Sequence, residues 1–187
     1  MFPLTLRNQK GGELTYEEID NNFKHVMFPP FLHIQDQKPQ GTDGGTFEAG
    51  AWRTRDLNTV LTNTIPGASL ANNQITLPAG KYYVEASAPI NSTLNYIVGV
   101  QAKLYNNTLS SDILIGQGNR HFANTHSGNS AFNSTIFGII ALENTSIITL
   151  QHRCGVNQAT YGFGYAANFT TEVYSDIRIW RIGEIDW

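Results

Sequence analysis

Hydrophobic and polar residues alternate along most of the chain with the period of a β-strand. In the clearest case one face of the segment 96–105 is formed by Tyr96, Val98, Val100, Ala102 and Leu104. The other segments with strand character are Phe31 to Asp36, Asn58 to Thr62, Gln74 to Leu77, Lys81 to Ala88, Ser111 to Ile115, Ser134 to Glu143, Ser146 to Cys154, Tyr161 to Phe169 and Glu172 to Ile182. The turn at 143–145 predicts a hairpin between the two apolar strands around it. Short strands with turns at this spacing predict an all-β sandwich or jelly roll.

One helix is predicted near the N-terminus. Thr15 can accept a hydrogen bond from the backbone amide of Glu18, whose side chain can reach back to Thr15 as in a capping box. Tyr16, Ile19 and Phe23 then lie on one face. A helix this short is marginal alone in water, so we expect that face to dock on another surface. The proline pair at 29 and 30 ends the helix and divides the chain into an arm, residues 1–30, and a head domain, residues 31–187.

Two segments indicate contact between copies of the chain. The segment 136–142 is apolar on both faces, which a half-solvated antiparallel strand should not be, and it contains Phe137 and Ile139. In the segment 161–166, Tyr161, Phe163 and Tyr165 share one face of the expected strand and small residues occupy the other. Glycine on a strand face allows another backbone or side chain to approach closely. Ordinary core packing inside one sandwich is the alternative for both segments.

The segment Gly41 to Thr59, with the sequence GTDGGTFEAGAWRTRDLNT, interrupts the strand pattern. Such a glycine-rich connection must be held by side-chain hydrogen bonds, since no regular ladder can form along it. We expect Arg53 and Arg55, together with Asp56, to fix the loop through buried or half-buried charged hydrogen bonds. Trp52 is expected to anchor it in the core.

Composition narrows the function classes. Charged residues make up 14% of the chain and the formal net charge is −3, whereas nucleic-acid binding requires clustered Lys and Arg. The abundant Asn, Thr, Ser and Gln suit a stable β surface or contact with sugar hydroxyls. No signal peptide and no membrane-length apolar run is visible, so we expect a protein made in the cytoplasm without membrane insertion. The single cysteine, Cys154, is expected to be a small buried hydrophobe.

No group of residues predicts catalysis, a cofactor or a metal site. The carboxylates are scattered, without sign of the convergent pair that a glycosidase requires, and no G-x-S-x-G nucleophile elbow is present. The spacing of His121 and His126 suits neither a helical nor a strand pair of metal ligands. Copies arranged around an axis could still gather such histidines around a cation. We expect a protein that is not an enzyme and holds no cofactor or metal.

The polar segment 120–129 is the candidate ligand-binding loop. It contains Arg120, His121, Asn124, His126 and Asn129 and few apolar residues that would anchor it. Loops commonly carry binding residues, and these guanidinium, imidazole and amide groups can meet sugar hydroxyls. A solvated loop without a ligand is the alternative.

Several sequence segments resemble segments of bacteriophage tail-fibre and receptor-binding proteins. GELTYEEIDNNF, at 12–23, resembles a short N-terminal motif of tail fibres. The segment 41–59 and the phrase LPAGKYYVEASAP, at 77–89, resemble the front half of a C1q/TNF-like head domain, and EVYSDIRIWRIG, at 172–183, resembles its last strand. The resemblance implies a C1q/TNF-like jelly roll that assembles as a homotrimer. It places Phe137, Ile139, Tyr161, Phe163 and Tyr165 near the three-fold axis.

Two functions are compatible with this resemblance. The first is a virion protein whose trimeric head recognises a glycan or protein on the host cell surface, while Tyr16, Ile19 and Phe23 dock the arm on another virion protein. The second is a structural virion component, such as a collar, capsid-fibre or decoration protein, without receptor binding. The chain has no long heptad run or repeat that would form a fibre shaft.

Overall fold

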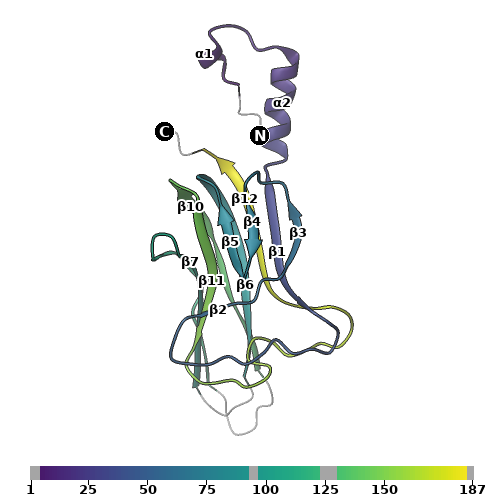
Figure 1. Ribbon diagram of the computed structural model, residues 1–187, viewed down its shortest axis with the longest axis vertical. Helices are drawn as coiled ribbons and strands as arrows, with labels where there is room; N and C mark the ends of the chain where they lie inside the picture. The colour runs from purple at the N-terminus through teal and green to yellow at the C-terminus, as the bar shows by residue number, and fades with distance from the viewer. Residues whose placement is uncertain (1–4, 93–96, 123–129, 185–187) are drawn as a thin grey trace.

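The computed structural model describes residues 5–92, 97–122 and 130–184, which form a β-sandwich preceded by a helical arm (Figure 1). The helices are α1 (Arg7–Lys10) and α2 (Tyr16–Met27). The strands are β1 (Phe31–Lys38), β2 (Arg53–Thr54), β3 (Thr59–Asn63), β4 (Ser69–Ala71), β5 (Gln74–Leu77), β6 (Gly80–Ser92), β7 (Ile97–Asn106), β8 (Ser111–Ile115), β9 (Asn119–Phe122), β10 (Ser130–Leu142), β11 (Ser146–Cys154) and β12 (Glu172–Gly183).

The strands form two antiparallel sheets. The five-stranded sheet has the order β10-β6-β12-β1-β3. The seven-stranded sheet has the order β4-β5-β11-β7-β8, with β2 paired to β11 and β9 paired to β7. Neighbours in the five-stranded sheet come from distant parts of the chain, and so do β5, β11 and β7 of the other sheet, as in a jelly roll. The expected all-β sandwich with a short N-terminal helix is confirmed.

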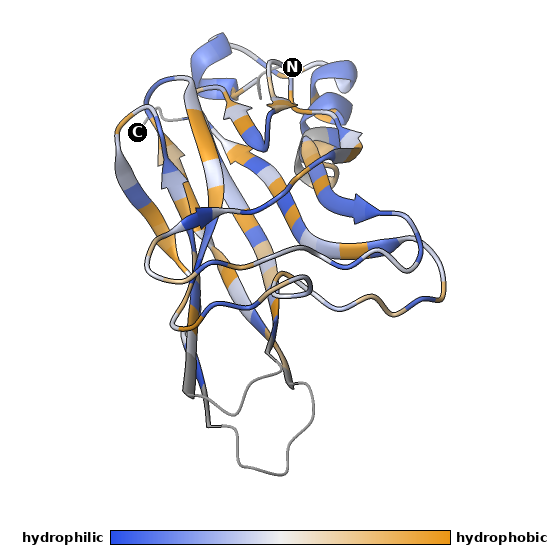
Figure 2. Cartoon of the chain, turned by 60° about the horizontal axis from the view of Figure 1, so that its bottom comes forward, coloured by the Kyte–Doolittle hydropathy of each residue, from blue (hydrophilic) through white to orange (hydrophobic). Residues whose placement is uncertain are grey.

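The period-two pattern places the core between the sheets. Along β1 the side chains of Leu32 and Ile34 are fully buried while their neighbours are partly exposed, and Figure 2 shows the same alternation of hydrophobic and hydrophilic residues along other strands. The largest core cluster includes Leu32, Ile34, Tyr82, Val84, Ile136, Ile140, Ile177 and Ile179 from one sheet and Ile75, Leu77, Ala102, Leu104, Ile148 and Leu150 from the other. Burial of such side chains supplies the main stabilising free energy of the fold.

The prediction of a hairpin around residues 143–145 is wrong. β10 pairs with β6 in the five-stranded sheet, whereas β11 pairs with β5, β2 and β7 in the other sheet. The turn is therefore a crossing between the two layers. Ile140 of β10 and Ile148 of β11 belong to the same core cluster, which each strand approaches from its own sheet. A local turn signal does not specify which sheet the following strand joins.

The strand expected over Tyr161 to Phe169 is also wrong, because residues 159–170 form turns and irregular loop. Conversely, β9 covers residues 119–122, which were expected to begin an exposed loop. β9 pairs with the first residues of β7. The short strands β2 and β4 have no strong sequence pattern, and their pairing depends on the neighbouring β11 and β5.

The arm contains the predicted helix with its capping box. The Thr15 side chain accepts a hydrogen bond from the amide of Glu18, and the Glu18 carboxylate accepts one from the amide of Thr15. Asn22 exchanges two hydrogen bonds with the backbone of Thr5, which ties the first residues of the arm to α2. In Figure 1 the arm projects from one end of the sandwich, beyond the start of β1.

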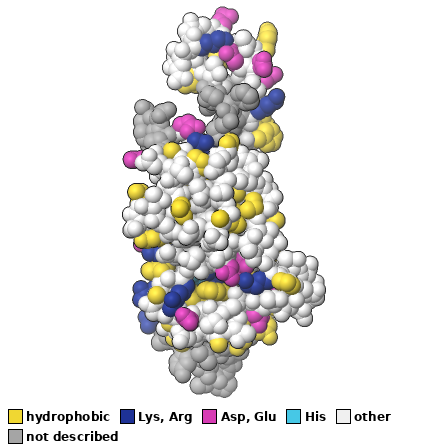
Figure 3. Space-filling model, viewed as in Figure 1, with side chains coloured by type: hydrophobic (Ala, Val, Ile, Leu, Met, Phe, Trp, Pro, Cys, Tyr) yellow, Lys and Arg dark blue, Asp and Glu magenta, His cyan; other side chains and the backbone are white. Residues whose placement is uncertain are grey.

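The surface seen in Figure 3 is largely uncharged. Lys and Arg side chains gather across the lower part of the head in this view, close to the end opposite the arm. Among the described residues, no helix has both the length and the apolar character needed to cross a membrane.

Candidate functional site

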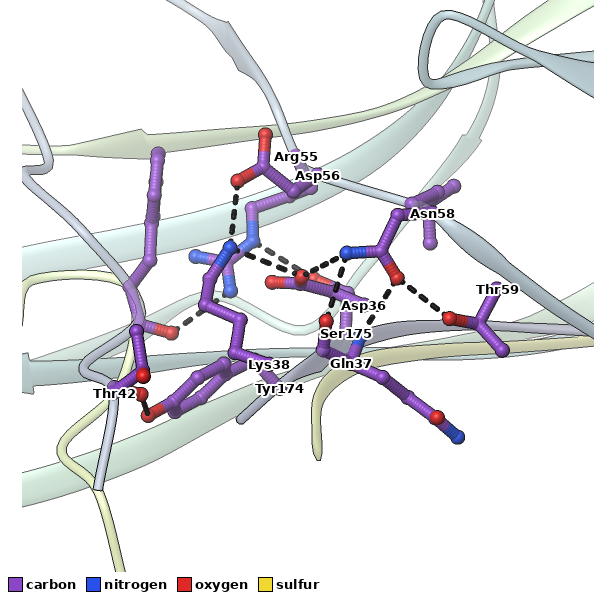
Figure 4. A network of polar contacts seen from close by, with 12 residues as sticks. Asp36, Gln37, Lys38, Thr42, Arg55, Asp56, Asn58, Thr59, Tyr174 and Ser175 are labelled. Carbon is purple, nitrogen blue, oxygen red and sulfur yellow. Dashed lines mark hydrogen bonds and ion pairs between the residues drawn. The ribbon is translucent and has the colours of Figure 1, made fainter. Parts of the chain in front are cut away.

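Arg55 is a fully buried charge that pins the irregular segment 41–59 (Figure 4). Its Nε donates to Ser175 Oγ at 2.8 Å, its two terminal nitrogens donate to the carbonyls of Pro89 and Phe163 at 3.1 and 2.8 Å, and its guanidinium lies 4.0 Å from the centre of the Phe163 ring. Burial lowers the pKa of Arg55 to about 9, so the side chain stays charged at pH 7. This confirms that side-chain hydrogen bonds hold the segment.

Carboxylates beside Arg55 complete the network. Lys38 Nζ lies 3.2 Å from buried Asp36 and 3.0 Å from Asp56. Asn58 donates to the Gln37 carbonyl and accepts from the Gln37 amide, which aligns the end of the loop with β1. Burial raises the pKa of Asp36, and the nearby Lys38 opposes that shift. The network runs from the buried Arg55 and Asp36 to the exposed Asn58 and explains the shape of the loop.

Arg53 and Asp56 are less buried than Arg55. The Arg53 guanidinium forms an ion pair with Glu48 at 3.1 Å and its side chain is 41% exposed. Asp56, 45% exposed, pairs with Lys38, not with either arginine. Of the three charges expected to be buried or half-buried, Arg55 is therefore fully buried and the other two are half-buried.

Another carboxylate joins two loops at the end of β12. Glu172 accepts hydrogen bonds from the backbone amides of Gly41, Ala167 and Asn168 at 2.8–3.0 Å. These donors, that of Gly41 first, lower the pKa of Glu172. Tyr174 donates to the Thr42 carbonyl at 2.7 Å (Figure 4). The loops at 41–46 and 160–168 thus form one supported unit.

The aromatic segment 161–165 packs inside its own chain. Phe163 stacks near Phe47 with ring centres 4.5 Å apart, within the second core cluster. A side chain at Gly162 would collide with the Gln158 carbonyl, and one at Gly164 would overlap the Tyr174 ring. The glycines are therefore explained by contacts within one chain, as the core-packing alternative proposed.

Tyr161 and Tyr165 pack edge to face at 5.3 Å, and Tyr165 is 56% exposed. Neither lies on a strand. Phe137 and Ile139 lie on β10, at the edge of the five-stranded sheet. The placement of all these residues near a three-fold axis stays a prediction.

The outer face of the five-stranded sheet carries an apolar row. Ile139 pairs with Tyr83, Tyr83 pairs with Trp180, and Trp180 pairs with Phe31, so that four strands place these side chains side by side. The Trp180 ring lies 4.8 Å from Phe31 and 5.7 Å from Tyr83. Ile139 is 63% exposed. We call Ile139, Tyr83, Trp180 and Phe31 the apolar row.

The next row of residues on the same face contains both apolar and polar or charged side chains. Phe137, 64% exposed, pairs with Glu85, and beyond it lie Arg178 and His33. Asp176 connects this row to the next, since it accepts from His33 and Gln35 and forms an ion pair with Arg178. A shallow hollow of about 800 Å³ lies between these strands, with Phe137, Tyr83 and Asp176 in its lining.

The outer face of the seven-stranded sheet is polar by contrast. Its strands β7 and β11 present Gln101, Lys103, Gln151 and Arg153 in adjacent registers. At the end away from the arm, a second hollow of about 490 Å³ opens on this face. It is lined by Trp52, Gly99, Val100, Gln101, Gly118, Asn119, Arg120, Arg153, Cys154 and Gly155. We call it the Trp52 hollow.

The predicted ligand loop is only partly described. Arg120 and His121 lie on β9, and Arg120 lines the Trp52 hollow. Asn124, His126 and Asn129 lie outside the described residues. Trp52, expected in the core, lines this hollow on the outer face. No sequence pattern predicts this hollow, since its walls come from β7, β9, β11 and the loop before β2.

The docking residues of the arm lie on an exposed helix face. Tyr16 is 89% and Phe23 63% exposed, while Ile19 is partly buried. Met27, one turn beyond Phe23, is 68% exposed. Exposed large apolar side chains at this spacing form a stripe along α2.

His152 and Cys154 are titratable groups buried within the head. His152 is fully buried, and burial together with the charge of Arg55 lowers its pKa to about 3. Burial raises the pKa of Cys154 to about 11, which confirms the expected buried, unreactive thiol. His33 is hydrogen-bonded to Asp176 of β12. Within the described ranges, no three His, Cys, Asp or Glu side chains gather as metal ligands would.

The comparisons with known proteins give no relative. No protein-family model matches the chain, and no curated protein matches it.

Proposed function

We propose that the chain is a virion protein whose head assembles as a homotrimer and recognises the surface of a host cell, while its arm attaches to another virion protein. The observation that carries the proposal is the apolar row together with exposed Phe137. Antiparallel sheets that face water normally present polar side chains on that face. A contiguous apolar surface on a β-sandwich is typical of an interface between proteins.

A second copy of the chain suits this surface best. β10 is the edge strand of its sheet, and no described strand pairs with its other edge. Phe137 and Ile139 lie on this edge strand, where a neighbouring head can reach them. Full burial of one such side chain contributes about 1.5–3 kcal/mol. In a closed trimer each contribution occurs three times.

The arm supports attachment to a different protein. The Tyr16 and Phe23 side chains lie on a helix that projects from the head (Figure 1). An amphipathic helix with such anchors can dock in a groove of a partner. The resemblance of segment 12–23 to tail-fibre proteins makes that partner a virion component.

The test has two parts. Light scattering of the whole chain should give three times the 20.7 kDa mass of one chain, and a monomer mass at micromolar concentration would overturn the trimer. Fluorescently labelled protein should bind susceptible bacterial cells and leave resistant strains unlabelled. Binding to neither set, with labelling of collar or capsid by antibodies against the head, would establish the structural alternative.

A further inference from the structure

The three glycines of the Trp52 hollow have no explanation within the fold. Gly99, Gly118 and Gly155 are absent from the residues with positive φ, so a residue with a side chain can adopt their backbone conformation. No described atom lies within 4 Å of where a Cβ of Gly99 would be. A Cβ at Gly118 or Gly155 would make only ordinary contacts, at 3.6 and 3.5 Å.

Glycine in the interior of a strand has a cost. Gly99 lies within β7, where glycine destabilises a strand because it loses more backbone entropy on folding and packs no side chain. Neither backbone geometry nor crowding within the described chain requires that choice. The empty space above the strand is therefore the feature that glycine provides, and a ligand that approaches the backbone would use it.

The wall residue Trp52 is held in place before any ligand arrives. The Lys103 ammonium lies 4.4 Å from the centre of the Trp52 ring and 4.9 Å from that of Tyr105. Lys103 is also paired with Asp112. A cation over the ring and an ion pair behind it fix the indole, so that little side-chain entropy is lost on binding.

Two amides add oriented acceptors. Gln101 donates its Nε2 to the Gly116 carbonyl at 3.0 Å, and Asn119 donates its Nδ2 to the Asn133 carbonyl at 2.9 Å. Both side chains are thereby fixed by their nitrogen atoms. Within the described part of the chain, no hydrogen bond uses the oxygen of either amide, so these oxygens remain to accept from ligand hydroxyls.

The charge of the lining is positive. Arg120 and Arg153 belong to it, and no carboxylate does. The overall chain is acidic, with a net charge of −3, so this local excess of positive charge is not a consequence of composition. Guanidinium groups bind carboxylates in a planar, two-point geometry.

We propose that the Trp52 hollow binds an acidic saccharide, with the sugar ring on Trp52, its hydroxyls on the Gln101 and Asn119 oxygens, and its carboxylate on Arg120 and Arg153. This inference rests on the proposed host recognition and names the class of receptor. A single site of this kind is shallow and binds weakly. Three copies in a trimer raise the apparent affinity through avidity.

The decisive variant fills the hollow without touching the core. Gly99→Leu places a side chain in the empty space above β7, and Gly183→Leu is its matched control, because Gly183 also has no atom within 4 Å of a Cβ position and lies at the end of β12. Both proteins should show the melting temperature and light-scattering mass of the wild type. Arg153→Gln and Trp52→Phe remove one proposed contact each.

The measurement is binding of the full-length protein to an array of acidic and neutral bacterial glycan fragments, followed by titration of the strongest acidic fragment and of its carboxyl-methylated form. We expect the wild type to bind acidic fragments. Methylation of the fragment, Gly99→Leu and Arg153→Gln should each lower the affinity by roughly tenfold or more. Gly183→Leu should leave the affinity unchanged. Quenching of tryptophan fluorescence on binding should disappear in Trp52→Phe.

Each of the following results would overturn the inference or the proposal on which it rests. Retention of neutral fragments alone, or unchanged titration of Gly99→Leu, excludes this site. A changed light-scattering mass for Gly99→Leu shows that another copy of the chain occupies the hollow. If Gly99→Leu still binds host cells like the wild type, the acidic saccharide site is wrong while host recognition stands. If the wild type binds no cells, host recognition itself is wrong.

Discussion

The two outer faces of the sandwich are built on the same kind of sheet but differ in chemistry. The five-stranded sheet presents the apolar row and Phe137 to its surroundings, whereas β7 and β11 of the seven-stranded sheet present amides, cations and glycine. Both sheets bury the same aliphatic core, so the difference does not come from folding. The proposals above assign one face to contact with another protein surface and the other to a polar ligand.

The largest expected effect comes from charge placed in the apolar row. Ile139→Glu should dissociate the trimer, because an unpaired carboxylate buried in the interface costs several kcal/mol, about 3 or more in each of the three copies. Light scattering should show a folded monomer with the circular dichroism spectrum of the wild type.

Ile115→Glu is the matched control for that variant. Ile115 lies on β8 of the other sheet and is 56% exposed, compared with 63% for Ile139. The control should keep the mass of the wild type. If Ile139→Glu and Ile115→Glu dissociated the protein to the same extent, the proposed assignment of the interface to the five-stranded sheet would be wrong.

Replacement of Arg55, the charge buried inside the head, should have the next largest effect, in this case on the free energy of unfolding. Arg55→Leu leaves Ser175 and two carbonyl groups without their charged donor, so it should lower the free energy of unfolding by about 3–5 kcal/mol. Urea denaturation measures it. The neighbouring Arg53→Leu removes only the surface pair with Glu48 and should change stability by less than about 1 kcal/mol. A similar loss in both would contradict the buried role of Arg55.

A lower pH should reduce the free energy of unfolding because of His152, which lies on β11 of the seven-stranded sheet. The unfolded chain protonates this histidine near pH 6.5, whereas the folded protein does so only at about 3. Between these values the unfolded state binds the extra proton, so stability falls as the pH is lowered, by about 1.4 kcal/mol for each pH unit. From pH 6.5 to 4.5 this amounts to about 3 kcal/mol.

His152→Leu isolates that effect, since its buried site has no hydrogen-bond partner for the ring nitrogens within the described residues. Denaturant titrations at several pH values should show a shallower acid loss for the variant than for the wild type. Parallel curves would mean that His152 is not buried in its neutral form.

The arm should affect stability least. Tyr16→Ser combined with Phe23→Ser changes two exposed side chains. The free energy of unfolding of the head should therefore stay within about 0.5 kcal/mol of the wild-type value. Attachment to virus particles should nevertheless be lost, as measured by immunolabelling. Asp20→Ser, an exposed polar position on the same helix, should keep attachment. Normal attachment of the double variant would reassign the docking surface.

Local rules explain what could be predicted from the sequence. The period-two pattern of β7 correctly placed Val100, Ala102 and Leu104 in the core, because alternation is a property of each strand by itself. The capping box at Thr15 and Glu18 formed as predicted for the same reason. The buried role of Arg55 followed from the need to hold an irregular glycine-rich segment.

Tertiary structure alone decided which segments meet. The turn at 143–145 has the composition of a hairpin, yet its strands join different sheets. β10 pairs along its whole length with β6, whereas β11 pairs with β5, β2 and β7. Phe163 has a strand-like setting, but Phe47 and Arg55 hold it in a loop. Trp52, Gly99 and Arg153 are far apart in sequence and converge only because β2, β7 and β11 pair at fixed registers. Strand pairing is non-local, so the sequence pattern fixes the face of each residue and the fold decides its neighbours.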